Sequence, residues 1–324
     1  MSFFTIFIAI LLAMNVGARN SSAEMAAAYT SGARTKKEAL ILIAIFVILG
    51  AIIAGLPVVK TLGGGLVSVR TFKAYFYIVF VVMGVMAFFD FISSVFKAPI
   101  PASYVIVSSI AAAGLYYESL SVEKFSAILR WWIFSPIAAF ILAFLAGKFL
   151  NLKFARFLGA SVIDGRMKAV LGAALSFSGC YVAFAGGANG AAKAMGPIVA
   201  AGIIDNRWGV LLGGAGIAAG ALMFGGAILE KSGGELAQIG LIKAISIETI
   251  CATILLAASF KGIPVSVSVT AASSLVGLGC ADLGFMRSMR QRRFLRTIFV
   301  WLLVPFSAGW VTYFILNTAS IVMR

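Results

Sequence analysis

The chain has 324 residues, of which 62% are hydrophobic and 11% charged, and its mean hydropathy is +1.06. A water-facing surface of this composition would be far too apolar, so a soluble globular protein is excluded. The net charge of +15 could suggest a nucleic-acid partner. However, the basic residues lie in short segments between apolar runs, as expected for charge that orients a membrane protein, and we expect no nucleic acid.

Apolar stretches of the length that crosses a bilayer as a helix, about 20 residues, follow one another along the chain. The first covers 2–31 and lacks the basic start and cleavage site of a signal peptide. Further spans are predicted at 39–58, 74–96, 102–117 and 126–147, and the clearest spans of the second half are 208–229 and 297–316. We therefore predict an all-α membrane protein with about ten transmembrane helices.

Cysteine and histidine usage limits the chemistry. The three cysteines, Cys180, Cys251 and Cys280, lie in apolar runs and are interpreted as packing residues. The chain contains no histidine, which removes histidine-based triads, HExxH zinc sites and histidine general bases. We expect no enzyme, no metal site and no cofactor.

The two halves of the chain repeat one another. Gly17-Ala18-Arg19-Asn20 matches Gly187-Ala188-Asn189-Gly190, an offset of 187 − 17 = 170. Pro101 and Ser103 match Pro264 and Ser266, an offset of 264 − 101 = 163. We predict a first transmembrane repeat at 1–147, a linker at 148–168 and a second repeat at 169–324. The five predicted crossings of the first repeat are an odd number, so the second repeat should be inverted.

Loop charges predict the orientation. The linker 148–168 carries five basic residues and one acidic residue, Asp164, which predicts that it is cytoplasmic. Alternation then places the basic residues at 34–37 and 287–296 inside, and the acidic turn at 118–123 outside with both termini. Lys60, Arg70 and Lys73 disagree with the rule, because alternation places them outside as well.

In each half the first span contains small and polar residues, GARNSSAEMAAAYTSG and GGANGAAKAMGP. One such stretch could equally serve close helix packing. Two, in corresponding places of an inverted repeat, indicate a transport site at the membrane midplane, where helix N-termini face an anion. We predict that the first helix of each repeat is broken there, as an unwound span or as a re-entrant hairpin.

Hydroxyl groups are frequent after two prolines, Pro101 and Pro264, each of which suits a helix start within the membrane. A span serine often bonds the carbonyl four residues earlier. The run from Ser266 to Ser274 holds five hydroxyls in nine positions. This density favours the interpretation that they donate hydrogen bonds to an oxyanion that enters the bundle.

Five ionisable residues fall inside predicted spans, where each is costly unless paired or hydrated. Arg19 could hold a tetrahedral anion by two hydrogen bonds, or could form a buried pair with Glu24. Lys193 could be a second positive group or pair with Glu248. The candidates for a proton carrier are Glu24, Asp90 and Glu248.

These motifs resemble the inorganic phosphate transporter family, whose halves each carry a GAND-type signature. GANGAAKAMGP is similar to that family's GANDVAKAIGP, and GIPVSVSVTAASSLVGLG to its GLPVSTTHALVGAIIGVG. The resemblance covers nearly the whole chain and implies oxyanion transport. The family's two signature aspartates fall on Asn20 and Gly190, so the phosphate and sodium binding attributed to them is not carried over. AEMAAAYTSGA and GLPVVKTL resemble the sulfate permease branch of the family.

The missing aspartates favour sulfate. Phosphate near neutral pH still carries a proton that a carboxylate can accept, whereas sulfate has only acceptors and a buried carboxylate repels it. The predicted function is import of sulfate by proton symport, with sodium less favoured as coupling ion. A phosphate symporter and an anion channel are the alternatives. The predicted substrate-binding residues are Arg19, Asn20, Ser21, Asn189, Gly190, Ser103, Ser266 and Ser268.

The remaining expectations concern the setting of the protein. The expected partners are a small inorganic anion and the lipid bilayer, in a prokaryotic inner (cell) membrane. The oligomeric state stays open, with a homodimer as one option.

Overall fold

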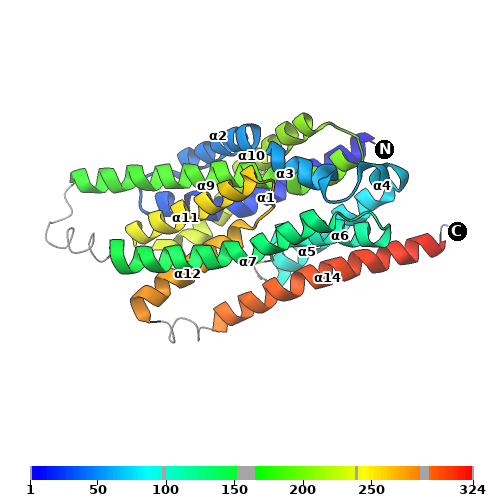
Figure 1. Cartoon of the computed structure of the whole chain (residues 1–324). Helices are drawn as coiled ribbons and strands as arrows, with labels where there is room; N and C mark the ends of the chain where they lie inside the picture. The colour runs from blue at the N-terminus through cyan, green and yellow to red at the C-terminus, as the bar shows by residue number, and fades with distance from the viewer. Residues whose placement is uncertain (1, 97–99, 152–164, 238–239, 285–291, 323–324) are drawn as a thin grey trace.

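The computed structural model describes residues 2–96, 100–151, 165–237, 240–284 and 292–322. Within these ranges eight helices are long and apolar enough to cross a bilayer, which confirms the all-α membrane fold. They are α1 (Ser2–Thr30), α2 (Lys36–Ala54), α5 (Tyr77–Phe96), α7 (Val122–Leu145), α9 (Gly165–Ala200), α10 (Asn206–Ala237), α11 (Leu241–Phe260) and α14 (Arg292–Val322). Figure 1 shows them as one elongated bundle.

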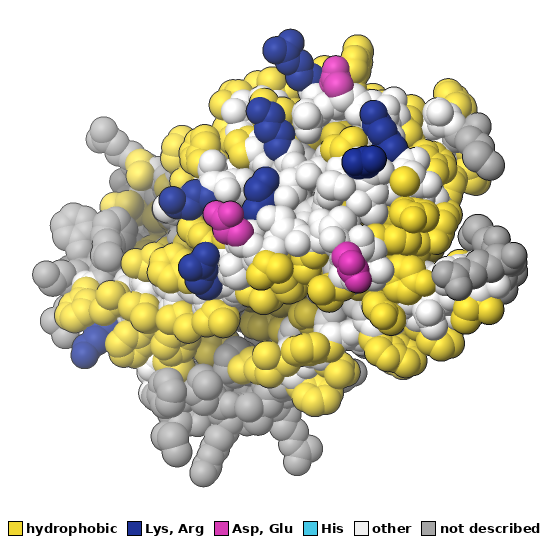
Figure 2. Space-filling model, turned by 45° about the vertical axis from the view of Figure 1, so that its right-hand side comes forward, with side chains coloured by type: hydrophobic (Ala, Val, Ile, Leu, Met, Phe, Trp, Pro, Cys, Tyr) yellow, Lys and Arg dark blue, Asp and Glu magenta, His cyan; other side chains and the backbone are white. Residues whose placement is uncertain are grey.

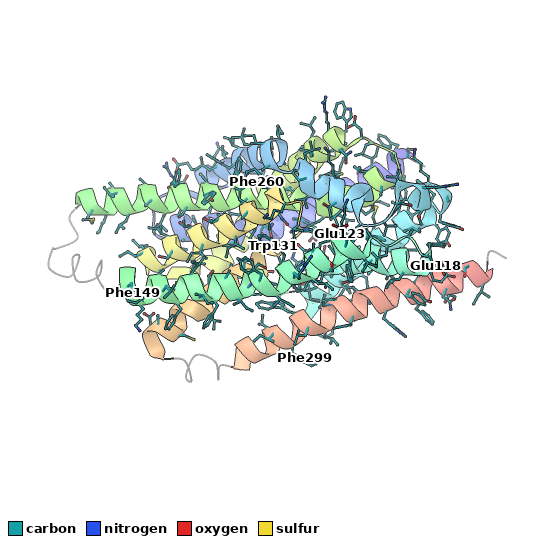
Figure 3. All side chains as sticks on the ribbon, in the orientation of Figure 1. Glu118, Glu123, Trp131, Phe149, Phe260 and Phe299 are labelled. Atoms are coloured by element: carbon teal, nitrogen blue, oxygen red, sulfur yellow. The ribbon has the colours of Figure 1, made fainter. Side chains whose placement is uncertain are left out.

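Two apolar helices are shorter, α6 (Ala102–Tyr116) and α12 (Val267–Leu283). At about 1.5 Å per residue they are roughly 22 and 25 Å long, less than the roughly 30 Å of a bilayer core. α6 follows α5 and α12 follows α11, so each pair is a helical hairpin. Figure 3 places Phe260, the last residue of α11, midway along the molecule. Of the roughly ten transmembrane helices that were predicted, eight in the described ranges are thus long enough to span the bilayer, and α6, predicted as a span at 102–117, is too short.

The two ends of the bundle differ in the segments that they carry. The termini end holds the N- and C-termini (Figure 1), and the linker end holds Phe149, close to the 148–168 linker (Figure 3). Three short elements, α3 (Leu56–Lys60), η1 (Thr61–Gly65) and α4 (Val69–Ala74), follow α2 at the termini end, and η2 (Ala146–Asn151) extends α7 at the linker end. The acidic residues Glu118 and Glu123 lie toward the termini end in Figure 3.

The predicted interruption of the first helix in each repeat is wrong, because α1 and α9 run through their glycine-rich stretches as continuous helices. A Cβ at Gly17 would lie 1.9 Å from the Ile217 carbonyl oxygen, and a Cβ at Gly187 would lie 2.0 Å from the Val47 carbonyl oxygen. The glycines therefore permit backbone contact between helices. The packing interpretation of these stretches holds.

Two of these contacts follow the offset of 170 residues that relates the sequence motifs. Gly17 on Ile217 and Gly187 on Val47 are related by one offset, since 187 − 17 = 217 − 47 = 170. The turns after the two helices are also alike, since Gly32 and Gly202 each follow the helix end by two residues and each have φ of +73°. In Figure 1 α1 starts beside the N label and α9 starts at the opposite end, so the equivalent helices run in opposite directions.

The outer surface of the bundle is apolar, as a lipid-facing surface must be. Phe177, Phe306 and Trp310 expose 76%, 77% and 68% of their surface. Side chains of this size in water would be an aggregation hazard, whereas acyl chains solvate them. The span prediction and the exposed surface therefore agree.

A valine at Gly50 should destabilise the fold strongly, because a Cβ there would lie 1.8 Å from the Phe184 carbonyl oxygen. The two helices must separate, at a cost of about 3 kcal/mol or more. Gly84→Val is the matched control, since Gly84 is exposed and a Cβ there meets nothing within 4 Å. Thermal unfolding in detergent should show a large loss of Tm only for Gly50→Val. Equal Tm values would contradict the backbone contact.

Candidate anion-binding site

The two hairpin tips meet inside the bundle. The hydroxyl of Ser103, in the first turn of α6, donates to the Val265 carbonyl just before α12, at 2.7 Å. The Trp132 indole of α7 donates to the Pro264 carbonyl at 3.0 Å and stacks on Tyr104 of α6, with ring centroids 4.0 Å apart. The N-termini of the two short helices therefore face one region inside the bundle.

Helix N-termini carry unsatisfied N–H groups and a partial positive charge, which together attract anions. Ser266 caps α12, with its hydroxyl accepting from the Val269 N–H at 3.4 Å and lying 2.9 Å from the Ser268 hydroxyl. α6 starts at Pro101 without a side-chain cap. Ser103, Ser266 and Ser268, three of the predicted site residues, are thus gathered at the tips.

Arg19 and Asn189 hold the two tips in the same way. Asn189 donates to the Ile263 carbonyl at 3.0 Å, and Arg19 donates to the Ile100 carbonyl at 3.2 Å. Ile100 and Ile263 differ by the second repeat offset, 263 − 100 = 163. Asn189 also accepts from the Val265 N–H at 3.0 Å. Each residue therefore links the middle of a long helix to the start of a short one.

The buried partner of Arg19 is Asp90 of α5, not Glu24. The same guanidinium donates to the Ser93 hydroxyl at 3.0 Å. The Asp90 side chain is 7% exposed, and its second oxygen has no hydrogen-bond partner among the described residues. A buried ion pair of this kind is stable only while both charges are present.

Glu24 lies fully buried where α1 packs on α9. Neither carboxylate oxygen has a hydrogen-bond partner in the described part of the chain. A Cβ at Gly186 would come within 2.9 Å of one of these oxygens, so the glycine leaves the room that the carboxylate occupies. Lys193, 4% exposed, interacts electrostatically with Glu24, Asp90 and Arg19. Two cations and two carboxylates thus share the buried centre.

Glu248, the third predicted proton carrier, lies on α11 and accepts a hydrogen bond from Ser178 of α9. Unlike Glu24, it has a polar partner in the bundle. The ion pairs found among the described residues do not include one between Lys193 and Glu248, and the charged neighbours of Lys193 are Arg19, Asp90 and Glu24.

Three of the predicted substrate-binding residues, Asn20, Ser21 and Gly190, form no hydrogen bond with the hairpin tips in the described part of the chain. Ser21 bonds its own Gly17 carbonyl at 3.0 Å and packs on α10, where a Cβ at Gly225 would come within 2.4 Å of its hydroxyl. Gly190 faces Ile217 of α10. Asn20 is half-buried on α1. Ser21 and Gly190 therefore belong to the contact between helices.

Several residues that build the tips were not predicted from the sequence, among them Ser93, Ile100 and Trp132. Ser93 of α5 and Trp132 of α7 reach the tips from other helices, and Ile100, just before α6, takes part through its backbone carbonyl. Only the fold brings these groups together. The one available pointer was the pair of prolines before α6 and α12. Among the described residues, no group of three or more Cys, Asp or Glu could hold a metal ion.

Two hairpins that meet tip to tip inside a bundle of spanning-length helices, with two helix N-termini at the tips and the Arg19 guanidinium bonded just before one of them, define a membrane transporter of an anion. The phosphate transporter family matches residues 16–312, and the chain belongs to this family.

Individual relatives agree with this assignment. Sulfate permease CysP of Bacillus subtilis is 32% identical over 96% of this chain and 86% of its own length. A putative phosphate permease of Pyrococcus furiosus is 24% identical over 86% of each chain. A solved sodium-dependent phosphate transporter has the same fold, with a TM-score of 0.79 at 19% identity over 99% of both chains. The relatives are transporters, in line with the expectation that the chain is not an enzyme.

Proposed function

We propose that this protein imports sulfate into a prokaryotic cytoplasm by proton symport across the inner membrane. The observation that carries the proposal is the composition of the hairpin tips. They offer serine hydroxyls, two helix N-termini and an asparagine, and the positions of the family's aspartates hold Asn20 and Gly190. Sulfate carries no proton to donate, so a site that lacks the two signature aspartates suits it better than it suits phosphate. The name of the CysP relative points the same way.

The buried charges supply a way to couple a proton to the anion. Arg19 and Lys193 balance Asp90 and Glu24 when all four are ionised. Protonation of Glu24 would leave these four side chains with a net charge of +1, which favours the binding of a dianion in the bundle. By linkage, the anion then favours the proton equally. Glu24 is the best placed carrier because, unlike Asp90 and Glu248, it has neither an ion pair nor a hydrogen bond in the described chain.

The orientation that we propose puts the linker end in the cytoplasm. The Lys36–Glu230 ion pair, at 2.8 Å, and the 2.9 Å hydrogen bond from Arg34 to Ser176 lie at this end and join both proposed repeats, 1–147 and 169–324. The termini end would then be outside. A reporter fused to the N-terminus should read as external, and an internal reading would overturn the orientation.

Uptake of labelled sulfate and labelled phosphate into proteoliposomes tests the substrate. We expect accumulation of sulfate when the outside is made acidic, and no stimulation by a sodium gradient. Preference for phosphate would favour the second candidate function, in which the unpartnered Glu24 carboxylate accepts the phosphate proton. Flux that never exceeds the anion's own electrochemical equilibrium would indicate a channel.

A further inference from the structure

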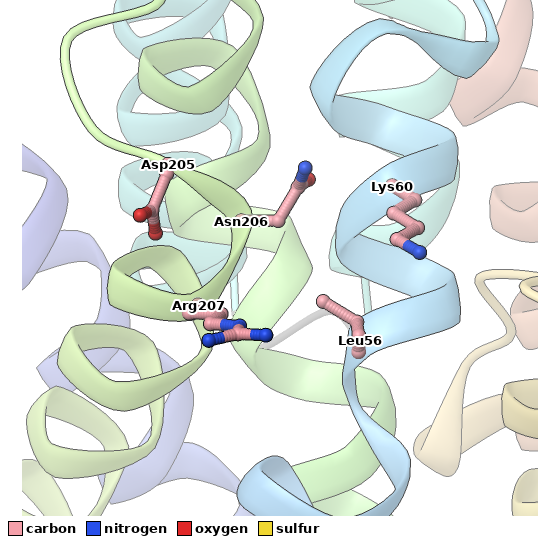
Figure 4. Close-up of a pocket in the computed structure, with 5 residues that line it drawn as sticks. All are labelled: Leu56, Lys60, Asp205, Asn206 and Arg207. Atoms are coloured by element: carbon pink, nitrogen blue, oxygen red, sulfur yellow. The ribbon is translucent and has the colours of Figure 1, made fainter.

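Four basic side chains surround η1 and the α9–α10 turn at the termini end. Lys60 and Arg207 line a pocket of about 350 Å³ between α3 and the start of α10 (Figure 4). A Cβ at Gly65 would lie 2.8 Å from the Lys124 ammonium, and a Cβ at Gly202 would lie 2.7 Å from the Lys73 side chain. We call this group, Lys60, Lys73, Lys124 and Arg207, the basic rim.

The positive charge of the basic rim is not neutralised by ion pairs. The ion pairs of the described chain are Arg19–Asp90, Lys36–Glu230 and Lys243–Asp282, and none involves the rim. Asp205, which also lines the pocket, accepts the Trp208 N–H at 2.8 Å and so caps α10. Figure 2, turned toward this end, shows more dark blue than magenta side chains. The face therefore presents a net positive potential to solvent.

In the proposed orientation this end lies outside, where positive charge runs against the rule that basic residues stay inside. The rim residues are exposed, so they do not stabilise the fold by burial. The charges of the basic rim therefore neither orient the chain nor pair with an acidic residue. A positive surface of this kind attracts anions from solution.

The basic rim lies next to the tip of the α11–α12 hairpin. Gly262, in the turn between the two helices, has φ of +69°. A Cβ there would lie 2.9 Å from the Pro57 carbonyl and 2.8 Å from the Thr61 hydroxyl. Pro57 and Thr61 flank Lys60, which belongs to the rim. The segment that carries the rim therefore touches the hairpin whose helix N-terminus forms part of the candidate site.

We propose that the basic rim is an entry site, which collects a divalent inorganic oxyanion from the outer solution and passes it to the hairpin tips. The proposal rests on the proposed import of such an anion. Electrostatic attraction raises the local anion concentration and is screened by salt. The rim therefore acts on the apparent KM at low ionic strength and leaves the maximal rate unchanged.

The first test compares two charge-matched double variants in proteoliposomes. Lys60→Gln/Arg207→Gln removes two rim charges, and Lys37→Gln/Lys168→Gln removes two exposed charges at the linker end. At low salt we expect the KM for external sulfate to rise about fivefold in the rim variant only. This change is smaller than the largest increases in association rate that electrostatic attraction produces. The difference should vanish at high salt. An unchanged KM, or an equal rise in the control, would overturn the proposal.

The second test is independent of transport. Sulfate should slow phenylglyoxal modification of Arg207, measured by mass spectrometry at constant ionic strength, and should leave exposed Arg70 unaffected. This protection is expected in vesicles of phosphatidylcholine alone. Protection by phosphatidylglycerol without sulfate would instead mean that the rim binds lipid headgroups, and no protection would mean that it binds neither. If the wild-type protein transports neither sulfate nor phosphate, the proposed function is wrong. The protection assay still shows whether the basic rim binds an anion.

Discussion

Replacing Glu24 by glutamine is expected to abolish proton-driven accumulation of the anion while preserving anion exchange. The glutamine has nearly the shape of the protonated carboxyl, so it fits the space beside Gly186. It fixes the buried centre at the net charge of +1 that favours a dianion. The site should therefore bind sulfate at any pH, but it can no longer release a proton with it.

The measurement pairs uptake under a pH gradient with exchange of internal and external sulfate. In the wild type, sulfate affinity should rise as the pH falls, because proton and anion binding promote each other. In Glu24→Gln it should not change with pH. Glu248→Gln is the comparison, since this buried carboxylate is bonded to Ser178. If Glu248→Gln loses accumulation and Glu24→Gln keeps it, Glu248 is the carrier.

The spanning helices could be predicted from the sequence because a run of apolar residues has the same length wherever it crosses a bilayer. The hairpins could not. In α6 the side chains from Ser103 to Gly114 are all buried. A buried half-length helix is as apolar as a lipid-facing one, so the hydropathy of 102–117 predicts a crossing. Only the position of its N-terminus, set by contacts such as Ser103 with Val265, shows that the helix begins inside the bundle.

The glycine-rich stretches show the opposite error. Their composition fits both an unwound helix and a close helix contact, and the difference lies in which element faces them. At Gly17 that element is the backbone of α10, which the sequence does not reveal. The partner of Arg19 was hidden for a similar reason. Glu24 is near it in sequence, whereas Asp90 comes from α5 and reaches Arg19 only in the folded chain.

Removing the Arg19 guanidinium should affect both stability and transport, and a double variant can separate the two effects. Arg19→Ala leaves Asp90 as a buried charge without its partner, which costs about 3 to 5 kcal/mol. We expect a marked loss of Tm and no measurable uptake. Arg19→Ala/Asp90→Ala removes both charges together, so most of the Tm should return.

Uptake by that double variant decides what the guanidinium does. If Arg19 only balances Asp90, sulfate transport should return together with the Tm. If Arg19 also donates to the anion, the folded double variant should have a KM for sulfate raised about 10- to 100-fold, the equivalent of one lost charged hydrogen bond. We expect the second result, because Asn189 occupies the equivalent position in the other repeat without any charge. An asparagine is thus sufficient to hold a hairpin tip. The contact with the tip therefore does not by itself explain why position 19 is an arginine.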